Sequence, residues 1–82
     1  MMNHPVVSLS LVLPAIAEIV DEQHISDEQA LEQLSAMLGE ARKHPYVKKA
    51  IARLRSCKDE LGFRAMLGTE GLRAMHESAK FD

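Results

Sequence analysis

The sequence predicts an all-α fold, a small bundle of about four short helices in a single helical domain that spans residues 1–82. A length of 82 residues is typical of one domain. Leu, Ala and Met dominate the apolar residues, which make up 46% of the chain, and these side chains favour helix because they are not branched at Cβ. Apolar residues also recur at helical spacing through the middle of the chain.

The N-terminal segment is compatible with two conformations. Over residues 6–13, apolar side chains alternate with Ser8 and Ser10, which is the period of a strand, but they also fall at helical spacing. Pro14 favours a helix that begins between Ser10 and Pro14, because proline fits the first turn and not the interior. We therefore expect a helix that ends near Gln23 and leave the segment before it open between strand and helix.

The same segment has two features of a signal peptide. Residues 6–16 form a short apolar run, and residues 15–17 have the small-x-small pattern of a cleavage site. No Lys or Arg precedes this run, so a signal peptide is not predicted, and no apolar run reaches the roughly 18 residues that span a membrane. The single cysteine, Cys57, excludes an internal disulfide and suits a reducing compartment. We expect a cytoplasmic protein with no membrane contact.

The second predicted helix spans residues 26–43. Ser26 and Gln29 form a capping box at its start, and two basic residues close its last turn. The dipeptide His44-Pro45 ends it, because the residue before a proline avoids helical geometry. Its apolar stripe consists of Ala30, Leu31, Leu34, Met37, Leu38 and Ala41.

The third predicted helix spans residues 45–61, and Gly62 is expected to end it. The break before it is short, so the second and third helices should fold back on each other or cross steeply. After residue 62 the motif of Gly62 to Met66 returns at Gly71 to Met75. With glycines at 62, 68 and 71, this tail is predicted to form two short helical pieces.

The charged residues are divided unevenly between the two halves of the chain. Residues 1–40 contain seven acidic residues and no Lys or Arg, whereas residues 41–82 contain all ten basic residues and five acidic ones. Either acidic and basic helices lie side by side and screen each other, or a basic face is open to an acidic partner. The formal net charge of −2 argues against a protein that bulk charge holds on nucleic acid.

The sequence shows no pattern of a catalytic or metal site. Its four histidines are scattered, without the local ligand pairs that zinc sites use. Cys57 falls on the apolar stripe of the third predicted helix, as a small buried side chain does. A Gly-rich phosphate loop and a nucleophile elbow are both missing from the sequence. We therefore predict no catalytic residue, no metal, no cofactor and no enzyme activity.

The basic face of the third predicted helix is the candidate partner-binding site. It consists of Lys48, Lys49, Arg53 and Arg55. This face either is simply solvated or binds acidic groups of a protein or phosphates. A helix-turn-helix centred on Gly39 would place Pro45 inside the recognition helix, and one centred on Gly68 would offer a single arginine. Nucleic acid is therefore the less favoured partner.

The function that these features favour is a non-enzymatic protein–protein interaction module, an adaptor, inhibitor or regulator that occupies a partner's surface. In size and composition it is similar to the small proteins with which bacteria and phages block larger machines. The alternative is a small dimeric nucleic-acid-binding transcriptional regulator, whose binding would weaken steeply with salt. So short a bundle leaves apolar surface exposed, and we therefore expect a homodimer.

Overall fold

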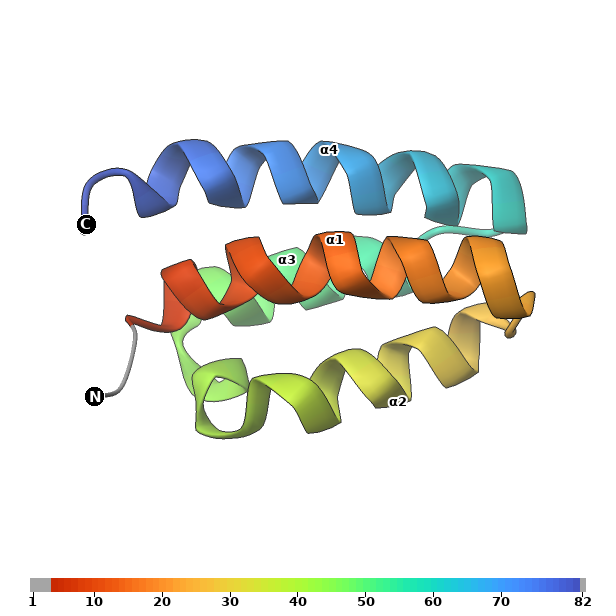
Figure 1. Cartoon of the computed structure of the whole chain (residues 1–82), viewed down its shortest axis with the longest axis horizontal. Helices are drawn as coiled ribbons and strands as arrows, with labels where there is room; N and C mark the ends of the chain where they lie inside the picture. The colour runs from red at the N-terminus through yellow and green to blue at the C-terminus, as the bar shows by residue number, and fades with distance from the viewer. Residues whose placement is uncertain (1–3, 82) are drawn as a thin grey trace.

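The computed structural model describes residues 4–81 and forms an up-and-down bundle of α-helices. Its elements are α1 (Pro5–Gln23), α2 (Asp27–Leu38), the 3-10 helix η1 (Gly39–Lys43), α3 (Pro45–Arg55) and α4 (Glu60–Ser78). Successive helices reverse direction, so α4 runs antiparallel to α1 (Figure 1). No strand occurs between residues 4 and 81, which confirms the all-α prediction.

Helix α1 begins earlier than predicted. It starts at Pro5 and carries Pro14 in its interior, so the strand alternative for residues 6–13 is wrong. His4 provides the missing start signal, because its Nδ1 accepts a hydrogen bond from the Val6 amide at 3.2 Å and Pro5 takes the first helical position. The helix buries one complete face, and this burial outweighs the hydrogen bond that Pro14 removes. That face holds Val6, Leu9, Leu13, Ile16 and Val20.

The predicted capping box of α2 is confirmed, but the helix is shorter than expected. The Ser26 hydroxyl accepts from the Gln29 amide, and the Gln29 side chain accepts from the Ser26 amide, both at 3.1 Å. The α-helix ends at Leu38, because Gly39 adopts a φ of +57°. Glycine enters this region without steric cost. The five residues of η1 then carry the chain to Lys43.

Helix α3 begins at Pro45 as predicted but ends at Arg55, six residues early. Asp59 is the reason, because its carboxylate accepts a hydrogen bond from the Gly62 amide at 2.6 Å and starts a new helix. Gly62 therefore lies in the first turn of α4 and does not end α3.

Helix α4 is continuous, so the prediction of two short pieces is wrong. Gly68 and Gly71 lie inside it, although each glycine costs about 1 kcal/mol of helix propensity. Tertiary packing compensates: Gly71 is buried against α1, where an added Cβ would lie 3.8 Å from the Leu13 Cβ. Phe63 and Leu67 extend the same buried stripe.

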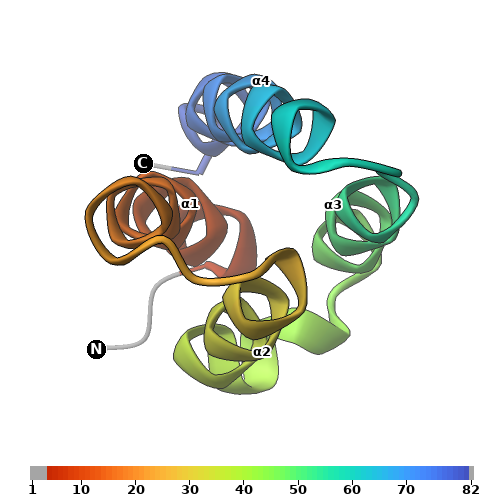
Figure 2. The same ribbon diagram turned by 90° about the vertical axis from the view of Figure 1, so that its right-hand side faces the viewer.

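The core lies between the four helices, and α1 contacts each of the other three (Figure 2). At one end of the bundle, the imidazole of His4 stacks on Phe81 with ring centroids 3.7 Å apart. This contact joins the start of α1 to the end of α4. None of the helices in the described part of the chain combines the length and the apolar character that crossing a membrane requires.

Candidate functional site

A groove between α2 and α3 holds part of the predicted site. Its shape depends on His44, whose Nδ1 accepts from the Tyr46 amide at 3.2 Å and caps α3. Because Pro45 occupies the first helical position, α3 begins directly after η1 and returns alongside α2. Three elements therefore contribute to the groove: α2, η1 and α3.

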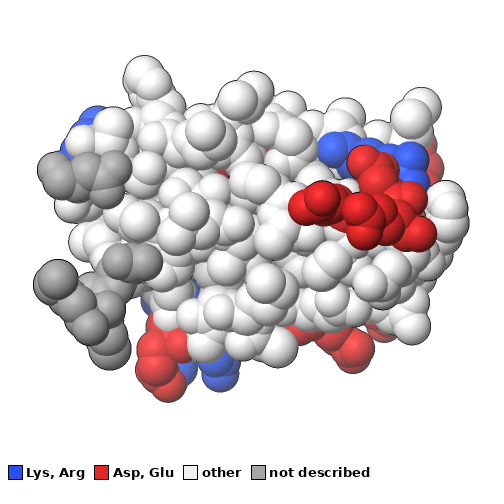
Figure 3. Space-filling model, viewed as in Figure 1, with Lys and Arg blue, Asp and Glu red and all other residues white. Residues whose placement is uncertain are grey.

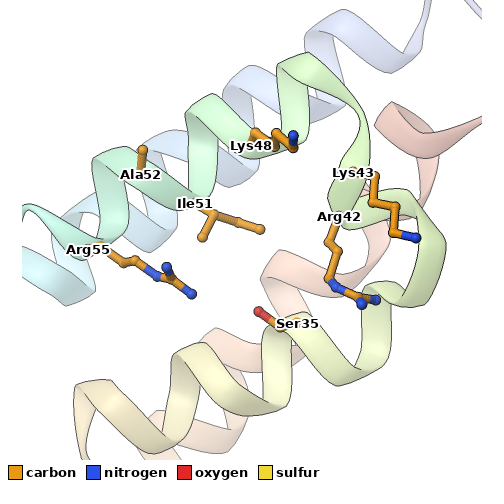
Figure 4. A pocket seen from close by; sticks show the side chains of 7 residues that line it. All are labelled: Ser35, Arg42, Lys43, Lys48, Ile51, Ala52 and Arg55. Carbon is orange, nitrogen blue, oxygen red and sulfur yellow. The ribbon is translucent and has the colours of Figure 1, made fainter.

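The basic half of the groove is a hollow of about 330 Å³. Figure 4 shows Arg55 reaching from α3 toward Ser35 of α2, with Arg42 on the other side of Ser35 and Ile51 projecting into the space from α3. The full lining is Ser35, Arg42, Lys43, Lys48, Ile51, Ala52 and Arg55. The hollow thus offers cationic side chains around an apolar floor.

The four cations of this hollow differ in what already binds them. Lys43 pairs with Glu40 at 3.2 Å, and Arg42 donates to the Gly39 carbonyl at 2.7 Å. Lys48 and Arg55 form no ion pair with any residue between 4 and 81. These two side chains are therefore available to an anionic group.

The groove continues into an acidic half. A second hollow of about 620 Å³ is lined by Glu28, Leu31, Glu32, Ser35 and Arg55. Ser35 and Arg55 belong to both hollows, so the two lie next to each other. The groove is acidic near the start of α2 and basic near η1. No local pattern in the sequence indicates this polarity.

The structure divides the four predicted site residues. Lys48 and Arg55 lie seven residues apart, which is two helical turns, and both line the groove. Lys49 is exposed but does not line it. Arg53 is directed toward α4, where it forms a bidentate ion pair with Glu70 at 2.7 and 2.8 Å. The predicted group of four is thus two groove residues, one exposed lysine and one structural arginine.

Glu70 is the charged residue whose role sequence reasoning missed. Its side chain is only 1% exposed, whereas that of Arg53 is 36% exposed. The hydrogen bond to Glu70 raises the pKa of Arg53 above its ordinary value. Glu70 follows Phe63 and Leu67 on the buried stripe of α4, and a carboxylate there requires a cationic partner. The glycines of the tail predict two short helices, so the sequence alone does not show that these residues share one buried stripe.

Metal ligands and the single cysteine are the other groups that could carry chemistry. Within the described residues no group of three His, Cys, Asp or Glu side chains is placed to hold a metal ion. Cys57 is partly buried against the core, and its thiol lies 3.6 Å from the Arg53 carbonyl and 3.7 Å from that of Gly62. The groove itself presents charged and apolar side chains together.

Comparisons of the chain with models of protein families, with curated proteins and with solved structures gave no match.

Proposed function

We propose that the protein is a non-enzymatic protein–protein interaction module, an adaptor, inhibitor or regulator, and that its α2/α3 groove binds a segment of a partner protein. The observation that carries this proposal is the combination in one groove of the apolar Leu31 and Ile51 with Lys48 and Arg55, which have no ion-pair partner among residues 4–81. Apolar contact supplies affinity at such interfaces, whereas charge steers the encounter and sets the orientation.

The polarity of the groove defines the partner segment. A segment that fits should place acidic side chains beside Lys48 and Arg55 and basic ones beside Glu28 and Glu32. An amphipathic helix meets both requirements, since it lays one apolar stripe into a groove and carries charges along its edges.

A nucleic-acid-binding regulator remains the second candidate. Arg42, Lys48 and Arg55 around one hollow favour phosphate binding. Glu28 and Glu32 oppose it, because a phosphate backbone that followed the groove would approach both carboxylates.

We also propose that the working form is a cytoplasmic homodimer. A lone thiol such as Cys57 is compatible with a reducing compartment. Leu11, Leu61 and Leu72 are each more than 60% exposed, and a second copy would cover such surface.

A charge-reversal pair tests the groove. Tagged wild-type protein, Lys48→Glu/Arg55→Glu and the control Lys49→Glu/Lys58→Glu are captured from the cells that naturally make the protein, with and without nuclease, and bound proteins are identified by mass spectrometry. The control makes the same change of net charge at two exposed cations that form no ion pair with the described residues.

The proposal expects one stoichiometric protein that wild type and control retain after nuclease treatment and that the groove variant loses. Equal retention by both double variants would reject the groove as the binding site. Recovery of nucleic acid, with all proteins lost after nuclease, would instead support the regulator.

A further inference from the structure

A second surface, the α1/α4 face, lies opposite the groove and is almost free of charge. Figure 3 shows it as a largely uncharged surface, with acidic and basic groups together at the end where α1 finishes and α4 begins. Several of its apolar side chains are strongly exposed: Leu11 is 62% exposed, Leu72 is 70% and Met75 is 54%. Monomeric proteins rarely leave such a continuous apolar surface uncovered.

The centre of this face is a shallow apolar hollow of about 310 Å³. It is lined by Pro14 and Ala17 of α1 and by Gly68, Gly71, Leu72 and Met75 of α4. Pro14 is the middle residue of α1, and Gly68 lies next to the middle residue of α4. The hollow therefore marks the midpoint of both helices.

We propose that the α1/α4 face binds a second copy of this chain through a two-fold axis that runs across the helices at the hollow. Each α1 then packs antiparallel to its counterpart, and so does each α4. This inference rests on the homodimer proposed above and is independent of the α2/α3 groove, which lies on the other side of the bundle (Figure 2).

The distribution of charge along the helices favours a two-fold axis across them over one that runs along them. Glu18, Asp21 and Glu22 lie at one end of α1, whereas residues 5–17 of the same helix carry no charge. A two-fold axis along the helices would place this acidic end over the start of the other copy's α4, which adds Glu60 and one cation, Arg64, that is already paired with Asp21. Such like-charge contacts are costly. An axis across the helices places each acidic end over the uncharged start of the other copy's α1.

The dimensions of the face also fit a dimer. The bundle measures 33 Å along its axis and 20 Å across. The outline that these extents enclose is roughly 660 Å², which sets an upper limit of about 1,300 Å² for the area buried on two copies. This limit lies within the range of roughly 1,200–2,000 Å² that stable interfaces bury. Leu72 and Ala65 lie on opposite sides of the midpoint of α4, about 4.5 and 6 Å away at the rise of a helix. The two-fold axis therefore sets a large side chain of one copy against a small one of the other.

Gly68 allows a test in which the variant still folds. A Cβ added at Gly68 would meet nothing within 4 Å, so Gly68→Arg fits the single chain. Arginine also favours helix over glycine by about 0.8–1 kcal/mol, so the variant should be at least as helical as the wild type. In the dimer, however, the guanidinium would stand at the centre of the apolar interface. Thr69→Arg is the matched control, since it adds the same charge one residue along, on an exposed side of α4 turned about 100° away.

The measurement is the mass in solution by sedimentation equilibrium over a series of concentrations, with circular dichroism to confirm helix content. Wild type and Thr69→Arg should show twice the chain mass of 9.1 kDa, and Gly68→Arg should show the single chain. A wild-type protein that stays at 9.1 kDa at every concentration, or a Gly68→Arg variant that still dimerises, would overturn the proposal. Lys48→Glu/Arg55→Glu should dimerise as the wild type does, so failure of the groove and failure of the dimer are distinguishable.

Discussion

The two sides of the bundle are both built from a pair of antiparallel helices, yet they form opposite kinds of surface. Helices α1 and α4 have 19 residues each, pack closely where Gly71 meets Leu13, and present an uncharged face. Helices α2 and α3 have 12 and 11 residues and leave a groove with charged rims between them. A small residue thus brings the two helices of one pair close together, whereas long charged side chains line the space between the helices of the other pair.

The uneven charge of the two halves of the sequence also has a structural consequence. The acidic first half and the basic second half do not neutralise each other through a network of ion pairs. Among residues 4–81, only Arg64 and Asp21, 3.5 Å apart, join the halves through a contact distant in sequence. The shortest ion pair among these residues, between Arg53 and Glu70 at 2.7 Å, lies within the basic half. Charge therefore distinguishes the two sides of the bundle and contributes little to holding the halves together.

The first prediction separates the two arginines of α3. Arg53→Ala should lower the free energy of unfolding by about 2–3 kcal/mol, because it leaves the Glu70 carboxylate buried without its partner. The loss is smaller than for a fully buried pair, since Arg53 is 36% exposed and Arg73 lies 3.7 Å from the same carboxylate. Arg55→Ala should change stability by no more than about 0.5 kcal/mol. Urea unfolding of the two variants measures this difference in stability. Equal losses would contradict the assignment of Arg53 as a structural residue and of Arg55 as a groove residue.

The second prediction concerns the two glycines of α4. Gly71→Leu should destabilise the fold by about 1–3 kcal/mol, because its side chain would be forced against Leu13 of α1. Gly68→Leu should instead stabilise it by roughly 0.5–1 kcal/mol, since it adds helix propensity in open space. Thermal unfolding at low protein concentration, where self-association contributes least, measures both. If the two substitutions shift the midpoint in the same direction, α1 and α4 do not meet at Gly71.

The third and smallest effect belongs to the acidic end of the bundle. Burial, and after it the nearby Glu60 and Asp59, raises the pKa of Asp27 above its ordinary value. The folded state therefore binds this proton more tightly than the unfolded chain does. Its contribution to stability falls as the pH rises from the ordinary value of about 3.9 through the folded pKa.

The substitution Asp27→Asn removes this titration. The variant should gain stability relative to the wild type as the pH rises through that window, by a few tenths of a kcal/mol. Urea midpoints of both proteins across the acid range measure the gain. A difference that is constant with pH, or that changes in favour of the wild type, would contradict the assignment.

The fold could be predicted from the sequence wherever a local signal decided the structure. The capping box at Ser26 and the start of α3 at Pro45 are of this kind. The errors at Pro14, Gly68 and Gly71 share one cause. In each case a helix-breaking residue was given more weight than the burial of α1 against α4, which depends on contacts between residues far apart in sequence.

The candidate site could likewise be predicted only where the local spacing of residues placed them together. The spacing of Lys48 and Arg55 already places both on one side of a helix, and the structure brings them to one groove. The role of Arg53 was not predictable, because its partner Glu70 lies 17 residues away on a helix that the sequence analysis divided. The polarity of the groove likewise depends on α2 and α3 lying side by side, which no local pattern specifies.

A crosslink at the middle of α4 tests most directly that the α1/α4 face is where two copies meet. Gly68→Cys is introduced together with Cys57→Ala, so that the new thiol is the only one. A two-fold axis at the hollow brings the two thiols together across helices about 8–10 Å apart, and mild oxidation should form a covalent dimer in high yield. Thr69→Cys in the same background should remain largely a single chain. Equal crosslinking of the two variants, or no covalent dimer from Gly68→Cys, would contradict the account.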